Sequence, residues 1–179
     1  MDSQFVAFPP KVLVRELYLI GFRVDPTADG PQFCTLIGSE GDGERPITKG
    51  DRLLFFRKPT DAAKALEESD NGFEDVRPVP TELELLCEIS EVLYLVNSEA
   101  EDKDGLLFEL IAVFDDLLRA VKMTVPAEYA TVLAAMAERL GESQEFASFL
   151  SGSGVTREKL EDALMWCVGA VAVKSTWVG

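Results

Sequence analysis

The chain has 179 residues, 47% of them hydrophobic, a formal net charge of −15 and no histidine. This composition is that of a folded protein. The acidity argues against binding nucleic acid or an anionic membrane surface, because both need lysine and arginine to neutralise phosphate. The missing histidine excludes Ser-His-Asp and Cys-His nucleophiles and histidine-containing zinc sites. We therefore expect no catalytic residue, no metal and no cofactor, and favour a non-catalytic protein over an enzyme.

The three cysteines, Cys34, Cys87 and Cys167, are far apart, and each has apolar neighbours. They predict buried structural thiols in a reducing, cytoplasmic protein. The first eleven residues lack the basic start and apolar core of a signal peptide. The longest uncharged apolar run, residues 163–173, is about half as long as a membrane helix. We expect no membrane span.

The charge is divided unevenly between the two halves of the chain. Residues 1–80 contain 10 basic and 14 acidic residues (net −4), whereas residues 81–179 contain 7 basic and 18 acidic residues (net −11). Eight of the nine prolines and seven of the thirteen glycines lie in the first half. This contrast predicts an α+β protein of two domains, a small sheet with one or two short helices (1–80) and an all-α region of four or five helices (81–179).

Short strands and turns are expected in residues 1–80. Three β-rich runs predict strands at residues 17–24, 32–37 and 52–57. The third run is continuously apolar, which indicates a strand buried on both faces. Residues 38–43 are rich in glycine and predict a hairpin tip between strands.

The end of the first half predicts one short helix and then an extended segment. Thr60 is the expected cap of a helix over residues 61–66, since its hydroxyl can accept from a first-turn amide. Asn71-Gly72 is expected to end this helix. Residues 76–80 contain two prolines, which suit a sheet edge or a linker.

From Thr81 the apolar period changes to that of helices. Thr81 and Glu84 match a capping box for a first helix. The apolar positions expected in the core of the successive helices are Leu86, Ile89, Leu93 and Val96; Leu107, Leu110, Ile111, Phe114, Leu118 and Val121; Tyr129, Val132, Leu133, Met136 and Leu140; Phe146, Phe149 and Leu150; and Leu160 and Leu164. Pro126 begins the third helix and Thr156 caps the last one.

Glu84, Glu88 and Glu91 follow at intervals of four and three, which predicts one acidic stripe on the first long helix. Three interpretations are open: half of a divalent metal site, a docking surface for a basic partner, or a solvated face. A di-metal site normally adds Glu-x-x-His, which a chain without histidine lacks. We include the three glutamates in a candidate interaction surface and assign no metal.

Other motifs do not predict a site. Residues 25–30 resemble the start of a calcium-binding loop, but Leu36 occupies the position of the bidentate glutamate. Residues 38–43 lack the Lys-Ser/Thr of a phosphate-binding loop. Asp115 and Asp116 point about 100° apart on a helix, so they do not form a catalytic pair, and Asp115 can pair with Arg119.

The C-terminal segment is unusually apolar. Residues 165–173 have no charged side chain, and Trp177 follows. Either this segment is the central helix of a bundle, or Met165, Trp166 and Trp177 form part of a self-association or partner surface.

Two functions follow as hypotheses. The first is a non-catalytic cytoplasmic interaction or regulatory protein whose acidic half meets a basic partner, with a homo-oligomer through the C-terminal helix as a further arrangement. The alternative is a small-molecule-binding protein or carboxylate-based enzyme. Its site would lie between the halves and would contain Arg52, Arg57 and the Glu84 to Glu91 stripe.

Overall fold

The computed structural model describes residues 15–41, 43–98, 102, 105–142, 150 and 154–179. Within these residues the chain is α+β, with seven strands in two sheets and five α-helices. The fold class expected from the composition is therefore confirmed at this level.

The larger sheet has four strands in the order β3-β2-β1-β6. Its strands are β1 (Arg15–Arg23), β2 (Phe33–Glu40), β3 (Gly43–Pro46) and β6 (Leu85–Glu88). The first three form an antiparallel meander, whereas β6 pairs parallel to β1, with Ile20 opposite Leu85 and Arg23 opposite Glu88. The expected strands at 17–24 and 32–37 are confirmed. A hairpin joins β2 to β3 as expected, but residues 38–40 belong to β2 and residue 43 to β3 rather than to the hairpin tip.

The smaller sheet has three strands, β4 (Thr48–Lys49), β5 (Arg52–Phe55) and β7 (Ser175–Trp177), in the order β4-β5-β7. β7 comes from the C-terminus and pairs parallel to β5. Leu53 and Phe55 belong to one apolar core, and Leu54 and Phe56 belong to the other. The expectation that this strand is buried on both faces is confirmed.

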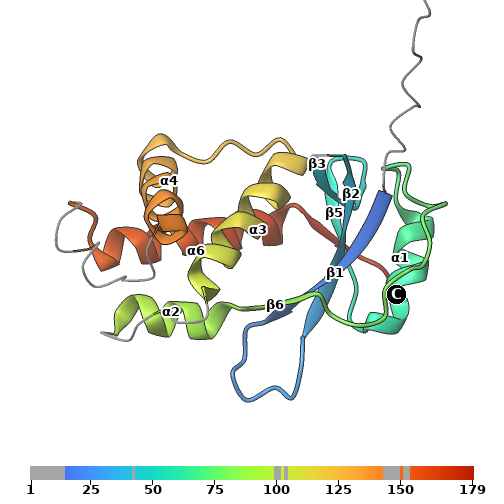
Figure 1. Ribbon diagram of the computed structural model, residues 1–179, viewed down its shortest axis with the longest axis horizontal. Coiled ribbons are helices and arrows are strands. Elements are labelled where there is room, and N and C mark those ends of the chain that lie inside the picture. The colour runs from blue at the N-terminus through green and yellow to red at the C-terminus, as the bar shows by residue number, and fades with distance from the viewer. Residues whose placement is uncertain (1–14, 42, 99–101, 103–104, 143–149, 151–153) are drawn as a thin grey trace, which may run out of the picture.

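The sheets lie between a small helical layer and a large one (Figure 1). On one side lie η1 (Pro59–Asp61) and α1 (Ala62–Glu68), and α1 contributes Ala62, Ala65 and Leu66 to the smaller core, which also contains Leu19 and Leu36. On the other side lie α2 (Ile89–Asn97), α3 (Leu106–Ala120), α4 (Ala127–Glu142) and α6 (Arg157–Val173). Alternation along β1 directs Leu19 to the smaller core and Ile20 and Phe22 to the larger one.

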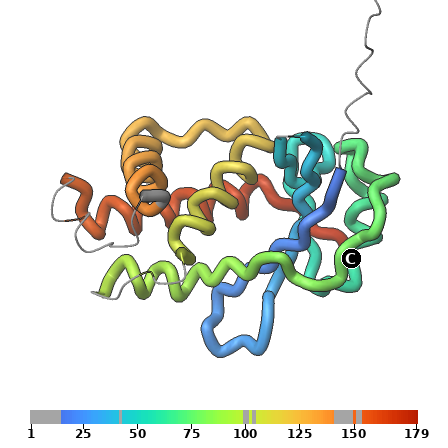
Figure 2. Tube along the Cα trace, viewed as in Figure 1, coloured from blue at the N-terminus to red at the C-terminus, as the bar shows by residue number. Residues whose placement is uncertain are grey.

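The long helices follow the apolar period of the sequence. All six apolar residues expected in the core of α3 are buried. Thr156 caps α6, since its hydroxyl accepts from the amide of Lys159 at 3.2 Å. After α6 the chain returns to the smaller sheet (Figure 2), where the amide of Val178 donates to the carbonyl of Phe55 at 2.8 Å. No helix among the described residues has the length and apolarity required to cross a membrane.

The predicted start of the first long helix at Thr81 is wrong. Residues 85–88 form β6, and the amide of Glu84 donates to the carbonyl of Leu19 at 2.9 Å. The helix α2 begins only at Ile89. Leu85-Leu86-Cys87 is too short for its period to separate strand from helix, and pairing with β1 decides the conformation.

The all-helical expectation for residues 81–179 is also wrong, because β6 and β7 add to the two sheets begun by residues 1–80. A division into domains at residue 80 stays a prediction.

Thr60 does not cap a helix: it lies in η1, and α1 begins at Ala62 with no side-chain cap. The short helix with Phe146 and Phe149, the Gly/Ser break at 151–153, Asp42 and Asp104 lie outside the described residues.

Candidate functional site

The structure separates the three glutamates of the expected stripe. Glu84 precedes β6, Glu88 ends β6 and Glu91 lies in the first turn of α2. The geometric premise of one helical stripe is therefore wrong, because only Glu91 lies within a helix. Glu88 pairs with Arg23 of the neighbouring strand, and Glu91 is exposed. The role of these residues in an interaction surface stays a prediction.

Glu84 instead joins carboxylates from two other elements. Glu44 of β3, Glu109 and Asp116 of α3, and Glu84 line one open pocket of about 380 Å³, which we call the acidic pocket. Tyr18 of β1 also lines it, and its hydroxyl donates to Glu16 at 2.6 Å. This arrangement forms because α3 crosses the sheet face beside β3. The sequence positions span 73 residues, from Glu44 to Asp116, so spacing alone does not predict the cluster.

The acidic pocket has little positive charge to balance it. Among the described residues, only Asp116 of the four carboxylates forms an ion pair, with Arg119 at 3.2 Å. Burial raises the pKa of Asp116 to about 6 against the opposing effect of Arg119, and Glu44 and Asp115 raise it further. The hydrogen bond to Glu16 is the largest cause of a raised pKa of Tyr18, followed by burial and then by the charges of Glu16, Glu44 and Glu84. The pocket therefore has a negative potential that favours a cation.

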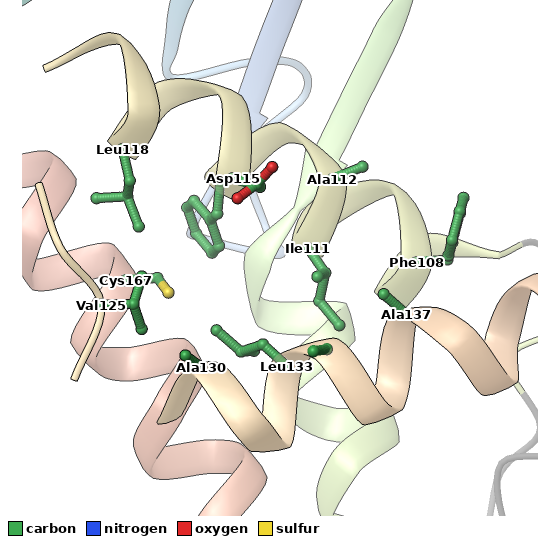
Figure 3. Close-up of a pocket in the computed structure, with 12 residues that line it drawn as sticks. Phe108, Ile111, Ala112, Asp115, Leu118, Val125, Ala130, Leu133, Ala137 and Cys167 are labelled. Carbon is green, nitrogen blue, oxygen red and sulfur yellow. The ribbon is translucent and has the colours of Figure 1, made fainter. Parts of the chain in front are cut away.

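A second pocket lies on the other side of α3. It has a volume of about 500 Å³ between α3, α4 and α6, and we call it the apolar pocket. Among the described residues that line it, the only polar groups are the carboxylate of Asp115 and the thiol of Cys167. The apolar lining residues are Phe108, Ile111, Ala112, Phe114, Leu118, Val125, Ala130, Leu133, Ala134 and Ala137. In Figure 3, Phe108 lies at one end of this pocket, and Leu118, Val125 and Cys167 lie toward the other.

The two polar groups of the apolar pocket do not form a catalytic pair. Asp115 is exposed and pairs with Arg119, as the sequence predicts. Cys167 is buried, and its burial raises the thiol pKa to about 11. A thiol with this pKa is protonated at neutral pH and is a poor nucleophile. The pocket is suited to binding an apolar group.

The apolar residues of the expected interaction surface lie in two places. Met165 is 48% exposed on α6, and the half-buried Trp166 beside it contacts Tyr129, with ring centroids 6.3 Å apart. Trp177 lies in β7 and packs against Phe33 and Phe55. A separate apolar pocket of about 230 Å³ adjoins Trp177. Self-association through these residues stays a prediction.

The arginines proposed for a site between the halves have structural contacts. Arg52 donates to the carbonyl groups of Val173 and Ser175, both at 3.1 Å, and so holds the end of α6 against β5. The guanidinium of Arg57 lies 5.5 Å from the ring centroid of Trp177. Neither arginine is among the residues of the acidic pocket, so the structure does not assemble the expected arginine–glutamate cleft.

The described part of the chain contains no group of three or more histidine, cysteine, aspartate or glutamate side chains arranged to hold a metal ion. The acidic pocket instead presents carboxylates from β3, from α3 and from the segment before β6, which suits several cationic groups on one partner. The sequence singled out Glu84 but missed Glu44, Glu109 and the apolar pocket. The only signal for them was the high acidity of the chain and the length of the α3 apolar pattern.

Comparison of the chain with protein-family models, with curated protein sequences and with solved structures found no match. The arguments about function therefore depend on the geometry of the acidic pocket and the apolar pocket.

Proposed function

We propose that this protein is a non-catalytic interaction protein that binds a basic segment of a partner protein through the acidic pocket. The observation that carries this proposal is the convergence of Glu44 from β3, Glu109 and Asp116 from α3, and Glu84 from the segment before β6. Like charges gathered in this way repel one another, and a cationic partner relieves the repulsion.

Two further observations support a basic protein as the partner. The net charge of −15 attracts basic chains from a distance and increases their association rate. Glu44 and Glu84 are exposed, so a partner side chain can reach both of them.

The free thiols of Cys34, Cys87 and Cys167 support our proposal that the protein acts in the reducing cytoplasm.

The test compares two variants that lose the same charge. The pocket variant carries Glu44→Gln, Glu84→Gln and Glu109→Gln, and the control variant carries Glu67→Gln, Glu74→Gln and Glu158→Gln at exposed positions outside the pocket. Each protein is titrated with a fluorescently labelled oligolysine peptide, and anisotropy gives the dissociation constant. We expect the pocket variant to bind at least about fivefold more weakly than the control variant.

The matched charge makes the outcome decisive. Diffuse attraction to an acidic protein weakens equally in both variants, since each loses three carboxylates. Equal affinities of the two variants would therefore refute the acidic pocket as the binding site. Circular dichroism and thermal unfolding check that both variants are folded.

A further inference from the structure

We propose that the basic segment is an amphipathic helix whose apolar side enters the apolar pocket while its lysines and arginines face the acidic pocket. This inference depends on the proposed function, because it names the chemistry of the same partner. It adds a second contact surface, which the acidity of the protein does not imply.

The two pockets adjoin each other along α3. Phe108 and Ala112, one helical turn apart, line both of them. Both residues are exposed, and Phe108 retains 40% of its accessible surface. They form a ridge with Ile111 and Leu118 on its apolar side and Glu109 and Asp116 on its acidic side. A partner that covers this ridge contacts both pockets at once.

The apolar pocket has room for more than one side chain. Its volume of about 500 Å³ lies within the usual range for pockets that bind small molecules or side chains. It is bounded by two long helices, α3 and α4, and a groove of this kind receives the apolar residues that recur every three or four positions along a partner helix. The exposed Ala134 leaves its α4 edge open.

Charge complementarity selects this occupant over an uncharged apolar molecule. A free apolar ligand fills the apolar pocket but leaves the carboxylates beside it without a counter-charge. A basic amphipathic helix satisfies both surfaces, because its cationic residues flank its apolar stripe. Exposed aromatic residues such as Phe108 are enriched at the centres of such interfaces.

The experiment uses three labelled peptides of about four helical turns. The first contains leucine at helical spacing among lysines, the second has the same composition with leucine at alternate positions, and the third contains lysine alone. We expect the first peptide to bind the intact protein about tenfold or more tightly than either of the others, because it alone brings an apolar stripe to the apolar pocket.

Variants locate this gain in affinity. Ala134→Phe fills the apolar pocket from its exposed edge and leaves the acidic pocket unchanged, whereas Ala63→Phe makes the same exchange on the exposed side of α1. Phe108→Ala removes the ridge aromatic and serves as a second variant. We expect Ala134→Phe and Phe108→Ala to abolish the preference for the first peptide and Ala63→Phe to preserve it.

The results separate the two proposals. If Ala134→Phe and Phe108→Ala keep the full preference for the first peptide, the apolar pocket is not its site, although oligolysine binding can still depend on the acidic pocket. If the uncharged probe N-phenyl-1-naphthylamine binds the intact protein but not Ala134→Phe, and the first peptide fails to displace it, the pocket holds a small molecule and the helix proposal is overturned. If the acidic-pocket variant and its charge-matched control bind oligolysine equally, the proposed function itself fails.

Discussion

Asp116 of α3 and Glu44 of β3 line the same pocket, close enough for the charge of Glu44 to raise the pKa of Asp116. This arrangement places two acids side by side at the junction of a helix and a sheet. Because the pKa of Asp116 is raised to about 6, chiefly by burial, small changes of pH near neutrality alter the charge of the acidic pocket.

Asp116→Asn tests the effect of this raised pKa on stability. The folded state holds the proton more tightly than the unfolded chain, so the free energy of unfolding falls as the pH rises from about 4 to about 6. The asparagine variant escapes this loss. The free energy of unfolding of the variant minus that of the parent should therefore increase by about 1 kcal/mol from about pH 4 to about pH 7, after allowance for solvent screening.

Urea unfolding at the two pH values measures this gain. Asp29→Asn, in an exposed turn, is the control that removes one carboxylate elsewhere. A stability difference between Asp116→Asn and the parent that stays constant or shrinks with rising pH would contradict the raised pKa.

Asp102 is expected to stabilise the start of α3. It is 3% exposed, and its two carboxylate oxygens accept from the amides of Leu106 at 2.8 Å and Leu107 at 3.0 Å. Asp102→Ala leaves both amides without this acceptor and should lower the free energy of unfolding by about 2 kcal/mol. Asp102→Asn keeps one oxygen and should cost less. Equal stability of the alanine variant and the parent in chemical denaturation would rule out this capping role.

Gly38 is expected to be intolerant of any side chain. A Cβ atom there would lie 2.5 Å from two ring carbons of the fully buried Phe73. The ring cannot move freely, because the guanidinium groups of Arg15 and Arg45 lie 5.3 Å and 5.0 Å from its centroid. Gly38→Ala should therefore destabilise the protein by about 1–3 kcal/mol in thermal or urea unfolding.

Gly30→Ala provides the control for this substitution. Nothing lies within 4 Å of a Cβ atom at Gly30, so the free energy of unfolding of the Gly30→Ala variant should stay close to that of the parent. A tolerated Gly38→Ala, with an effect no larger than that of the control, would contradict the close packing of Phe73.

The three thiols are expected to react slowly in the folded protein. Cys34, Cys87 and Cys167 are free and buried, and burial raises their pKa values to about 11, about 12 and about 11. A thiol reagent at neutral pH should label them fully only after denaturation, as counted by mass spectrometry. Rapid labelling of Cys167 before that would show that the apolar pocket opens in solution.

Apolar periodicity determined much of this fold without reference to the rest of the chain. It located α3, α4 and α6, because a helix forms its hydrogen bonds within one segment and its buried side carries a period of 3.6 residues. The strands β1, β2 and β5 were also recognisable, and the cap by Thr156 depends only on a residue three positions away.

Pairing between distant segments decided the rest. β6 and β7 became strands because β1 and β5 offered free edges, although the short sequence of β6 fits a helix as well. The same holds for the candidate site. The sequence contains Glu44, Glu84, Glu109 and Asp116, but only the packing of α3 across the sheet brings them to one pocket beside an apolar one. Composition determines the sign of the charge, and tertiary structure decides where that charge is concentrated.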